Sequence, residues 1–271
     1  MENWNFGPPV VGDRAEVAAP RGGVLLLHGY GEHAGRYAHV VEALNKADFS
    51  VFTYDQRGHG RTGGPRALIR VADLAADHLA AREWLRVRRP GLPVFALGHS
   101  LGGLVTAVSA LRDPRGLAGV VLSSPALIVG QGEPAWRRRL AGVASRALPN
   151  LQVGAVAAGV LSRDPDVDEK FRADPLCYGG RVKARTGFEM MQGGNLLWGN
   201  LGRWTLPTLV IHGDADGLIT IEGSRRFERE IASEDKELWE VAGGYHELFN
   251  DLESEQAIAK VVGWLKNHSL M

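Results

Sequence analysis

Continuous apolar segments alternate with longer amphipathic segments along most of this chain, and this alternation constrains the fold more than any other feature. A continuous apolar run indicates a strand that helices cover on both faces. Strands are predicted at residues 23–27, 50–54, 94–97, 120–122, 209–211 and 237–241. Helices are predicted at residues 36–47, 71–88, 101–111 and 253–267. Strands that alternate with helices imply right-handed crossovers, so we expect an α/β fold with a mostly parallel, doubly wound sheet.

In such sheets the chemistry belongs to the loops that follow the strands. The segment Gly98–Gly102 reads GHSLG and fits G-x-S-x-G, between an apolar strand and a helix that begins near Leu101. This strand–turn–helix setting is typical of a nucleophile elbow, which exposes the hydroxyl and aims the first helix amides beside it. We predict Ser100 as the nucleophile and the Leu101 amide as an oxyanion donor. The alternative is a glycine-rich turn with an incidental serine.

A serine hydroxyl needs a base, and the base needs an orienting acid. His246 follows the last short strand, and Asp216 follows the strand at residues 209–211. The order Ser, Asp, His is typical of this elbow type. Asp214 competes with Asp216 but is suited to capping a turn, so we favour Asp216. The histidines show no H-E-x-x-H spacing, and we expect neither a metal nor a cofactor.

The strand–helix alternation breaks between residues 128 and 204. We interpret residues 128–204 as a mostly helical cap insertion over the strand ends, with residues 1–127 and 205–271 as the core. The insertion includes an apolar stretch from Val153 to Leu161 that we expect to be helical. An extra helical layer far from the site is the alternative. The candidates for lining the pocket are Phe171, Met190, Leu196 and Trp198.

Composition limits the partners. Lys and Arg together number 31, as do Asp and Glu, so the formal charge is zero and nothing favours nucleic acid. Cys177 is the single cysteine, so an internal disulfide is impossible. The N-terminus does not resemble a signal peptide, and no apolar run approaches the ~18 residues that span a bilayer. We expect a cytoplasmic protein that binds a small uncharged or amphipathic molecule and at most touches a membrane surface transiently through the cap.

Two further segments carry a resemblance to a known family. Residues 28–37 read HGYGEHAGRY, which resembles the H-G-x-G-E-H-x-x-R-Y signature of monoacylglycerol lipases and related lysophospholipases among the α/β-hydrolases. Residues 54–60 read YDQRGHG and resemble a second loop of that group. The resemblance implies that Ser100, Asp216 and His246 form the catalytic triad and that the Tyr30 amide is the second oxyanion donor.

The resemblance also places Glu32 and Arg36 near the alcohol end of the pocket, although their charges are equally suited to a local ion pair. It implies a serine hydrolase that cleaves carboxylic esters of single-chain lipids, above all monoacylglycerols, through an acyl-enzyme. Tyr30 stands where mammalian relatives often have a small residue, which indicates a narrower acyl pocket. The alternatives are a short-chain carboxylesterase or thioesterase and, from another class, a non-catalytic small-ligand receptor.

Overall fold

The computed structural model describes residues 1–130, 134–154, 157 and 159–269. An eight-stranded sheet forms its centre, in the order β1-β2-β4-β3-β5-β6-β9-β10. The pairs β1/β2 and β2/β4 are antiparallel, and all other pairs are parallel, which confirms the predicted mostly parallel sheet. The strands are β1 (Glu2–Trp4), β2 (Val11–Ala15), β3 (Gly22–Leu27), β4 (Phe49–Asp55), β5 (Val94–His99), β6 (Gly119–Ser123), β9 (Thr208–Gly213) and β10 (Lys236–Val241).

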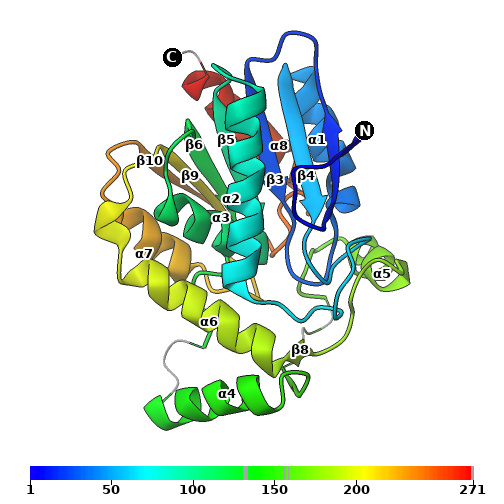
Figure 1. Ribbon diagram of the computed structural model, residues 1–271, viewed down its shortest axis with the longest axis vertical. Coiled ribbons are helices and arrows are strands. Elements are labelled where there is room, and N and C mark those ends of the chain that lie inside the picture. Colours follow the sequence, from blue (N-terminus) through cyan, green and yellow to red (C-terminus); the bar gives the residue numbers. More distant parts are fainter. Residues whose placement is uncertain (131–133, 155–156, 158, 270–271) are drawn as a thin grey trace.

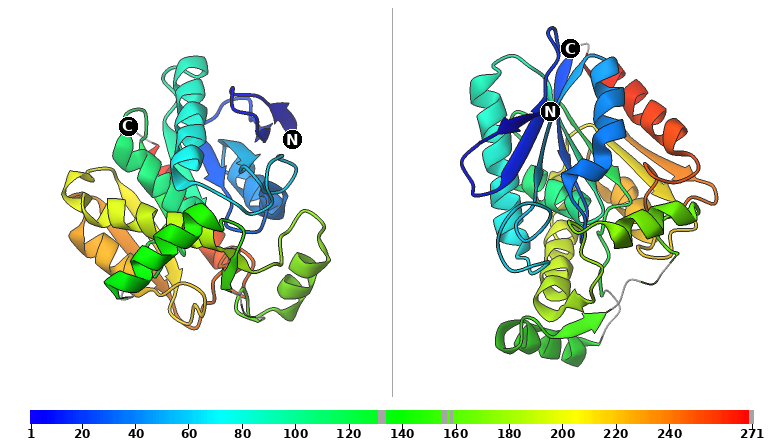
Figure 2. Two further views of the ribbon diagram at one scale, coloured as in Figure 1. Left: turned by 60° about the horizontal axis from the view of Figure 1, so that its bottom comes forward. Right: turned by 90° about the vertical axis from the view of Figure 1, so that its right-hand side faces the viewer.

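Helices cover both faces of this sheet (Figures 1 and 2). The side chains of β3 alternate between two cores: Leu25 and Leu27 pack into one, and Val24 and Leu26 into the other. The first core includes side chains from α2 (Val71–Arg88), α3 (Leu101–Arg112) and α7 (Glu222–Glu230). The second includes side chains from α1 (Ala38–Lys46) and α8 (Ser254–His268). The continuous apolar runs are therefore strands that are buried on both faces.

Three elements of the eight-stranded sheet and its covering helices escaped the sequence prediction. The strands β1 and β2 form the antiparallel edge of the sheet, and β2 reads VGDRA, which lacks the apolar run that identified the central strands. Helix α7 reads EGSRRFERE and buries only Phe227 among its large side chains. The predicted helix at residues 36–47 begins as a 3-10 turn, η1 (Ala34–Tyr37), before α1.

The segment between β6 and β9 lies beyond the ends of the strands that carry the predicted site (Figure 1). Within it, α6 packs against α2 and α3, and β7 pairs with β8. The predicted helix at residues 153–161 is wrong at its start, because Val153 and Gly154 belong to β7; residues 155, 156 and 158 lie outside the described residues. The elements of the segment are α4 (Ala135–Ala147), β7 (Gln152–Gly154), α5 (Pro165–Ala173), β8 (Val182–Lys183), α6 (Ala184–Trp198) and η2 (Leu201–Arg203).

Across the residues that the structure describes, no helix is both long and apolar enough to cross a membrane.

Candidate active site

Ser100 occupies a strained turn between β5 and α3. Its backbone has φ of 51° and ψ of −117°, a conformation that costs free energy for a residue with a side chain. The flanking glycines allow the turn to close. A Cβ atom on Gly98 would lie 2.4 Å from the Gly102 carbonyl oxygen, and one on Gly102 would lie 2.3 Å from the Leu27 carbonyl oxygen. These contacts require glycine at both positions, as the G-x-S-x-G pattern predicts for a nucleophile elbow.

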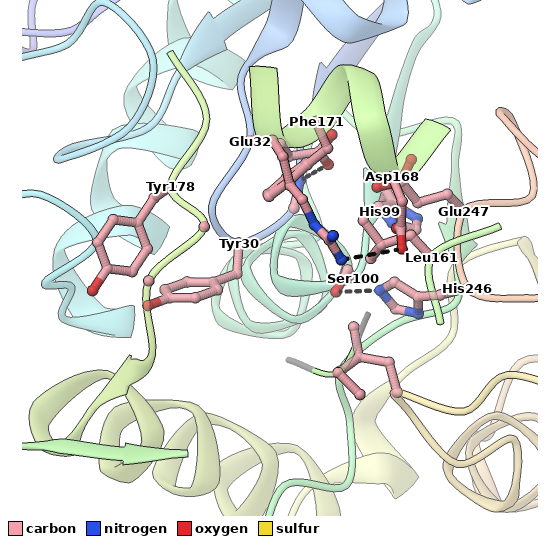
Figure 3. A pocket seen from close by; sticks show the side chains of 16 residues that line it. Tyr30, Glu32, His99, Ser100, Leu161, Asp168, Phe171, Tyr178, His246 and Glu247 are labelled. Carbon is pink, nitrogen blue, oxygen red and sulfur yellow. Dashed lines mark hydrogen bonds and ion pairs between the residues drawn. The ribbon is translucent and has the colours of Figure 1, made fainter. Parts of the chain in front are cut away.

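The three residues predicted as the triad come together in series. His246 Nε2 lies 2.9 Å from Ser100 Oγ (Figure 3), and His246 Nδ1 lies 2.7 Å from Asp216 Oδ2. The other carboxylate oxygen of Asp216 accepts hydrogen bonds from the amides of Leu218 at 2.8 Å and Ile219 at 2.9 Å. The carboxylate is therefore fixed at both oxygens, and it holds the imidazole with Nδ1 protonated and Nε2 free to accept the serine proton.

Burial and charge act against each other at this pair. Burial lowers the pKa of His246, but the carboxylates of Asp216, Glu247 and Glu32 together outweigh burial, and the net pKa lies above its ordinary value. Burial raises the pKa of Asp216, but His246 and His212 outweigh it and the carboxyl stays ionised. An ionised carboxylate beside the imidazole stabilises the imidazolium that forms when the base takes a proton.

The structure also separates the two candidate acids. Asp214 Oδ1 accepts a hydrogen bond from the Gly243 amide at 2.6 Å and so ties its own loop to the loop that precedes His246. Asp216 Oδ2 contacts two imidazoles, since His212 Nε2 lies 3.1 Å away in addition to His246. The sequence-based preference for Asp216 over Asp214 agrees with this geometry.

Two backbone amides border the serine. Gly29 lies against it, because a Cβ atom on Gly29 would be 3.1 Å from Ser100 Cβ. The next amide, that of Tyr30, and the amide of Leu101 donate no hydrogen bond to any acceptor within the described parts of the chain. Unpartnered amides beside a nucleophile are the arrangement that an oxyanion requires.

A cavity opens over the serine (Figure 3). One part of its wall is aromatic and aliphatic, and another carries carboxylates, so both an acyl chain and a polar alcohol have matching surfaces there. His99, the residue before the nucleophile, also lines the cavity; burial lowers its pKa to about 3 and keeps the ring neutral. The labelled lining residues are Tyr30, Glu32, His99, Ser100, Leu161, Asp168, Phe171, Tyr178, His246 and Glu247.

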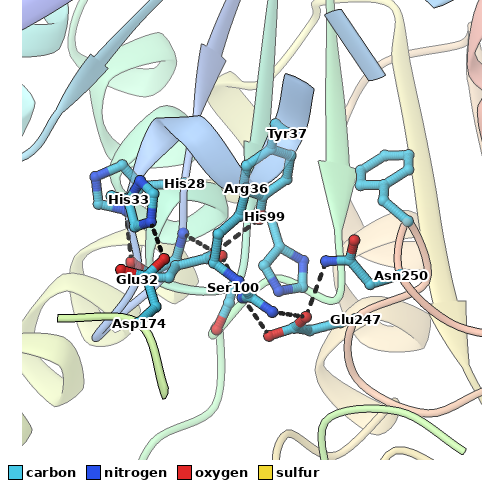
Figure 4. A network of polar contacts seen from close by, with 12 residues as sticks. His28, Glu32, His33, Arg36, Tyr37, His99, Ser100, Asp174, Glu247 and Asn250 are labelled. Carbon is cyan, nitrogen blue, oxygen red and sulfur yellow. Dashed lines mark hydrogen bonds and ion pairs between the residues drawn. The ribbon is translucent and has the colours of Figure 1, made fainter. Parts of the chain in front are cut away.

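Glu32 and Arg36 form the ion pair that the sequence allowed, and they form it at the cavity. Arg36 Nη1 lies 2.7 Å from Glu32 Oε2, and Glu32 lines the cavity while Arg36 does not. The guanidinium also makes two 2.7 Å bonds to Glu247, a residue that sequence reasoning did not assign to the site (Figure 4). The signal that could have identified Glu247 is a charged residue directly after the base, in a loop that continues with Leu248 and Phe249.

Three predicted pocket residues in α6 do not line the cavity. Met190 is buried in the core shared with α2 and α3. Leu196 is exposed. The indole N–H of Trp198 donates to the Leu127 carbonyl at 3.0 Å, and its ring packs against Arg226. Their prediction was wrong because α6 turns its apolar face toward α3 and not toward Ser100. The fourth candidate, Phe171 of α5, does line the cavity.

One cluster near the cavity carries metal-ligand side chains: the ligand atoms of His33, Asp174 and Cys177 lie within 4.8 Å of one another. His33 Nδ1 accepts a hydrogen bond from the Gly35 amide, so its proton resides on Nε2, which lies 2.8 Å from Asp174 Oδ2. The imidazole is thus engaged at both nitrogens, and we interpret the contact as a hydrogen bond that joins η1 to the segment after α5.

The hydroxyl of Ser100, the imidazole of His246 and the carboxylate of Asp216 follow β5, β10 and β9 and are hydrogen-bonded in series. This arrangement on a mostly parallel sheet defines the class of the α/β-hydrolases.

Comparison with known proteins identifies the family. Residues 18–253 match the family described as serine aminopeptidase, S33. The chain is 36% identical over 250 residues to a monoacylglycerol lipase of Mycolicibacterium smegmatis, an alignment that covers 92% of this chain and 89% of the relative. It is 33% identical over 239 residues to the human monoglyceride lipase, covering 87% and 78%. The crystal structure of a Paleococcus ferrophilus monoacylglycerol lipase matches with a TM-score of 0.85 and 35% identity, over 99% of this chain and 100% of that one. The chain belongs to the serine aminopeptidase S33 family of hydrolases.

Proposed function

We propose that this protein is a serine hydrolase that cleaves the carboxylic ester bond of monoacylglycerols. The observation that carries the proposal is the hydrogen-bonded series from Ser100 through His246 to Asp216, placed beside the two unpartnered amides of Tyr30 and Leu101. The substrate follows from the relatives, since those that share 33–36% identity over most of the chain are named as monoacylglycerol or monoglyceride lipases.

The mechanism divides ester cleavage into two displacements. His246 Nε2 accepts the Ser100 proton as Oγ attacks the ester carbonyl, and the oxyanion forms between the amides of Tyr30 and Leu101. The imidazolium then protonates the leaving glycerol oxygen, which leaves an acyl group on Ser100. His246 next deprotonates a water that attacks this acyl-enzyme, and it returns the proton to Oγ as the fatty acid departs.

The cavity offers matching surfaces for the two halves of the substrate. We assign the acyl chain to the wall that includes Tyr30, Phe171 and Tyr178, because rings and aliphatic chains bury apolar area together. We assign the glycerol to the side of Glu32 and Glu247, whose carboxylates accept hydrogen bonds from hydroxyl groups. This division favours a lipid ester over the short-chain esters of the alternative prediction.

We further propose that residues 128–204 act as a cap that also contacts membranes. Helix α4 exposes Trp136, Leu140 and Val143, each more than half accessible, together with basic side chains at residues 137–139. Apolar side chains beside basic ones on an exposed helix are typical of elements that lie at a lipid surface. We expect Leu140→Asp to reduce flotation with anionic vesicles, whereas Val87→Asp, at an equally exposed apolar position on α2, leaves flotation unchanged. Equal flotation of the two variants would contradict the proposal.

Labelling with a fluorophosphonate tests the enzyme assignment against the non-catalytic receptor. The probe reacts only with an activated serine, so we expect one adduct, located at Ser100 by peptide mass spectrometry, and none in Ser100→Ala. Labelling at another serine, or no labelling of the folded protein, would refute the assignment.

A further inference from the structure

Three charged residues between the base and the oxyanion loop share one buried network (Figure 4). The guanidinium of Arg36 lies between two carboxylates, with one 2.7 Å bond to Glu32 and two to Glu247. Glu32 is 3% exposed and Glu247 is 5% exposed, and the Arg36 side chain is 11% exposed. Buried charges persist only when they are paired, so these contacts fix all three side chains relative to one another.

Each carboxylate is also tied to a reacting element. Glu32 Oε1 accepts a 2.6 Å hydrogen bond from the amide of Gly29, the residue before the proposed oxyanion donor Tyr30. Glu247 directly follows His246 in the chain, and its own amide donates to the Leu161 carbonyl at 2.8 Å. The guanidinium thus connects the loop after β3, which presents the amide, to the loop after β10, which presents the base.

The network also carries unbalanced charge. Two carboxylates face one guanidinium, so the three groups together hold one net negative charge at the cavity wall. Burial lowers the pKa of His246; Asp216 raises it, and Glu247 and Glu32 raise it further. The charged and titratable groups that face His246 or line its cavity are Asp216 after β9, His99 at the end of β5, Tyr30 and Glu32 after β3, Glu247 on its own loop, Asp168 and Arg172 of α5, and Tyr178. Arg36 is bonded to Glu32 and Glu247.

We propose that Glu32, Arg36 and Glu247 form a positioning clamp, which sets the distance between the Tyr30 amide and His246 and supplies one net negative charge that favours the imidazolium. The clamp rests on the proposed function, because it acts on the transition state of ester cleavage. The clamp does not contact the reacting atoms, namely Ser100 Oγ and the ester carbonyl, and it acts on them through the amide and the imidazole that it holds. A small displacement of either group lowers turnover more than substrate binding.

Two substitutions at Glu247 separate position from charge. Glu247→Asp keeps the charge but shortens the side chain, so it cannot hold Arg36 as before. We expect kcat to fall about tenfold to a hundredfold, with little change in KM and no shift of the acid limb of the pH profile. Glu247→Gln removes the charge. We expect a similar loss of kcat and a shift of the acid limb to lower pH by about one unit, because His246 then loses its proton more readily.

Asp77→Asn is the matched control. Asp77 is buried and receives two bonds from Arg57, at 2.6 and 2.7 Å, but neither residue lines the cavity. We expect it to lower the melting temperature and leave kcat, KM and the pH profile as in the wild type. If Glu247→Gln does not fold, Glu32→Gln tests the other end of the clamp, and we expect the same shift of the acid limb. This variant keeps the contact with the oxyanion loop, because its amide oxygen can still accept the hydrogen bond from the Gly29 amide.

All rates are measured on one p-nitrophenyl ester, with the wild type and Ser100→Ala in the same series. The clamp is supported if the acid limb moves with Glu247→Gln, stays with Glu247→Asp and stays with Asp77→Asn. It is overturned if the Glu247 variants lose only thermal stability, as the control does. A wild type that is inactive, or a Ser100→Ala variant that stays active, would instead refute the proposed function and leave the clamp without a reaction to act on.

Discussion

Asp216→Asn is the substitution whose consequences the structure defines most closely. Oδ2 faces two imidazole nitrogens, those of His246 at 2.7 Å and His212 at 3.1 Å, and Oδ1 accepts from the amides of Leu218 and Ile219. All four groups are donors. An asparagine amide in either orientation therefore turns its own N–H groups toward two of them, so a donor faces a donor whichever way the side chain is flipped.

Both stability and turnover follow from this count. In the orientation that keeps the Leu218 and Ile219 bonds, His212 Nε2 keeps a second acceptor, the Ile219 carbonyl oxygen at 3.1 Å, so at most one buried donor is left without an acceptor or forced into another tautomer. Such a loss costs about 1–3 kcal/mol of unfolding free energy. The same orientation places an N–H opposite His246 Nδ1 and favours the other tautomer. In that tautomer Nε2 carries the proton and cannot accept one from Ser100. A wrong tautomer of this kind lowers kcat by about 10⁴-fold in triad enzymes, or ~5.5 kcal/mol of activation free energy.

The measurement is the initial rate on a p-nitrophenyl ester at saturating substrate, together with thermal unfolding of the same preparations. Asp214→Asn serves as the matched control, because Asp214 accepts a single amide, that of Gly243, and an asparagine oxygen can still accept it. We expect Asp214→Asn to keep kcat within about threefold of the wild type, because the retained acceptor keeps the loop that precedes His246 in place. A larger loss of kcat in Asp214→Asn than in Asp216→Asn would refute the reasoning.

Three further predictions concern the elbow, the cavity and pH. Gly102→Ala places a Cβ atom 2.3 Å from a backbone oxygen, so we expect the free energy of unfolding to fall by more than about 3 kcal/mol in thermal unfolding. Gly63→Ala is the control, because a Cβ atom there would have nothing within 4 Å, and equal melting temperatures of the two variants would contradict the argument. Tyr30→Ala removes an aromatic wall of the cavity, so we expect the preferred acyl chain to lengthen in a rate series, and an unchanged preference would show that Tyr30 does not limit the chain. His246 acts as a base only when neutral and its pKa is raised, so we expect kcat/KM to increase with pH through a midpoint above 6.5. A midpoint below 6.5 would show that burial outweighs the neighbouring carboxylates.

The sequence predicted the parts of this protein that local patterns determine. Continuous apolar runs identified the central strands, and the loops after those strands contained Ser100, Asp216 and His246, which the sheet then brings together. The orientation of a helix within the insertion is decided by its tertiary contacts, and for this reason the prediction for Met190 failed.

Glu247 shows the same limit at the site itself. Glu247 contacts Arg36, a residue 211 positions away in the chain, and no local pattern predicts that contact. The antiparallel strands β1 and β2 and the polar helix α7 were also missed, because contacts with neighbouring elements stabilise them and their sequences lack a periodic apolar pattern.

The central claim is that Ser100, His246 and Asp216 hydrolyse monoacylglycerols. Initial rates on monoacylglycerols of increasing acyl length test this claim most directly. Matched p-nitrophenyl esters are run alongside, with Ser100→Ala as the control. We predict a maximum at medium or long monoacylglycerols that disappears in Ser100→Ala. Turnover confined to short activated esters, or monoacylglycerol hydrolysis that survives in Ser100→Ala, would contradict the account.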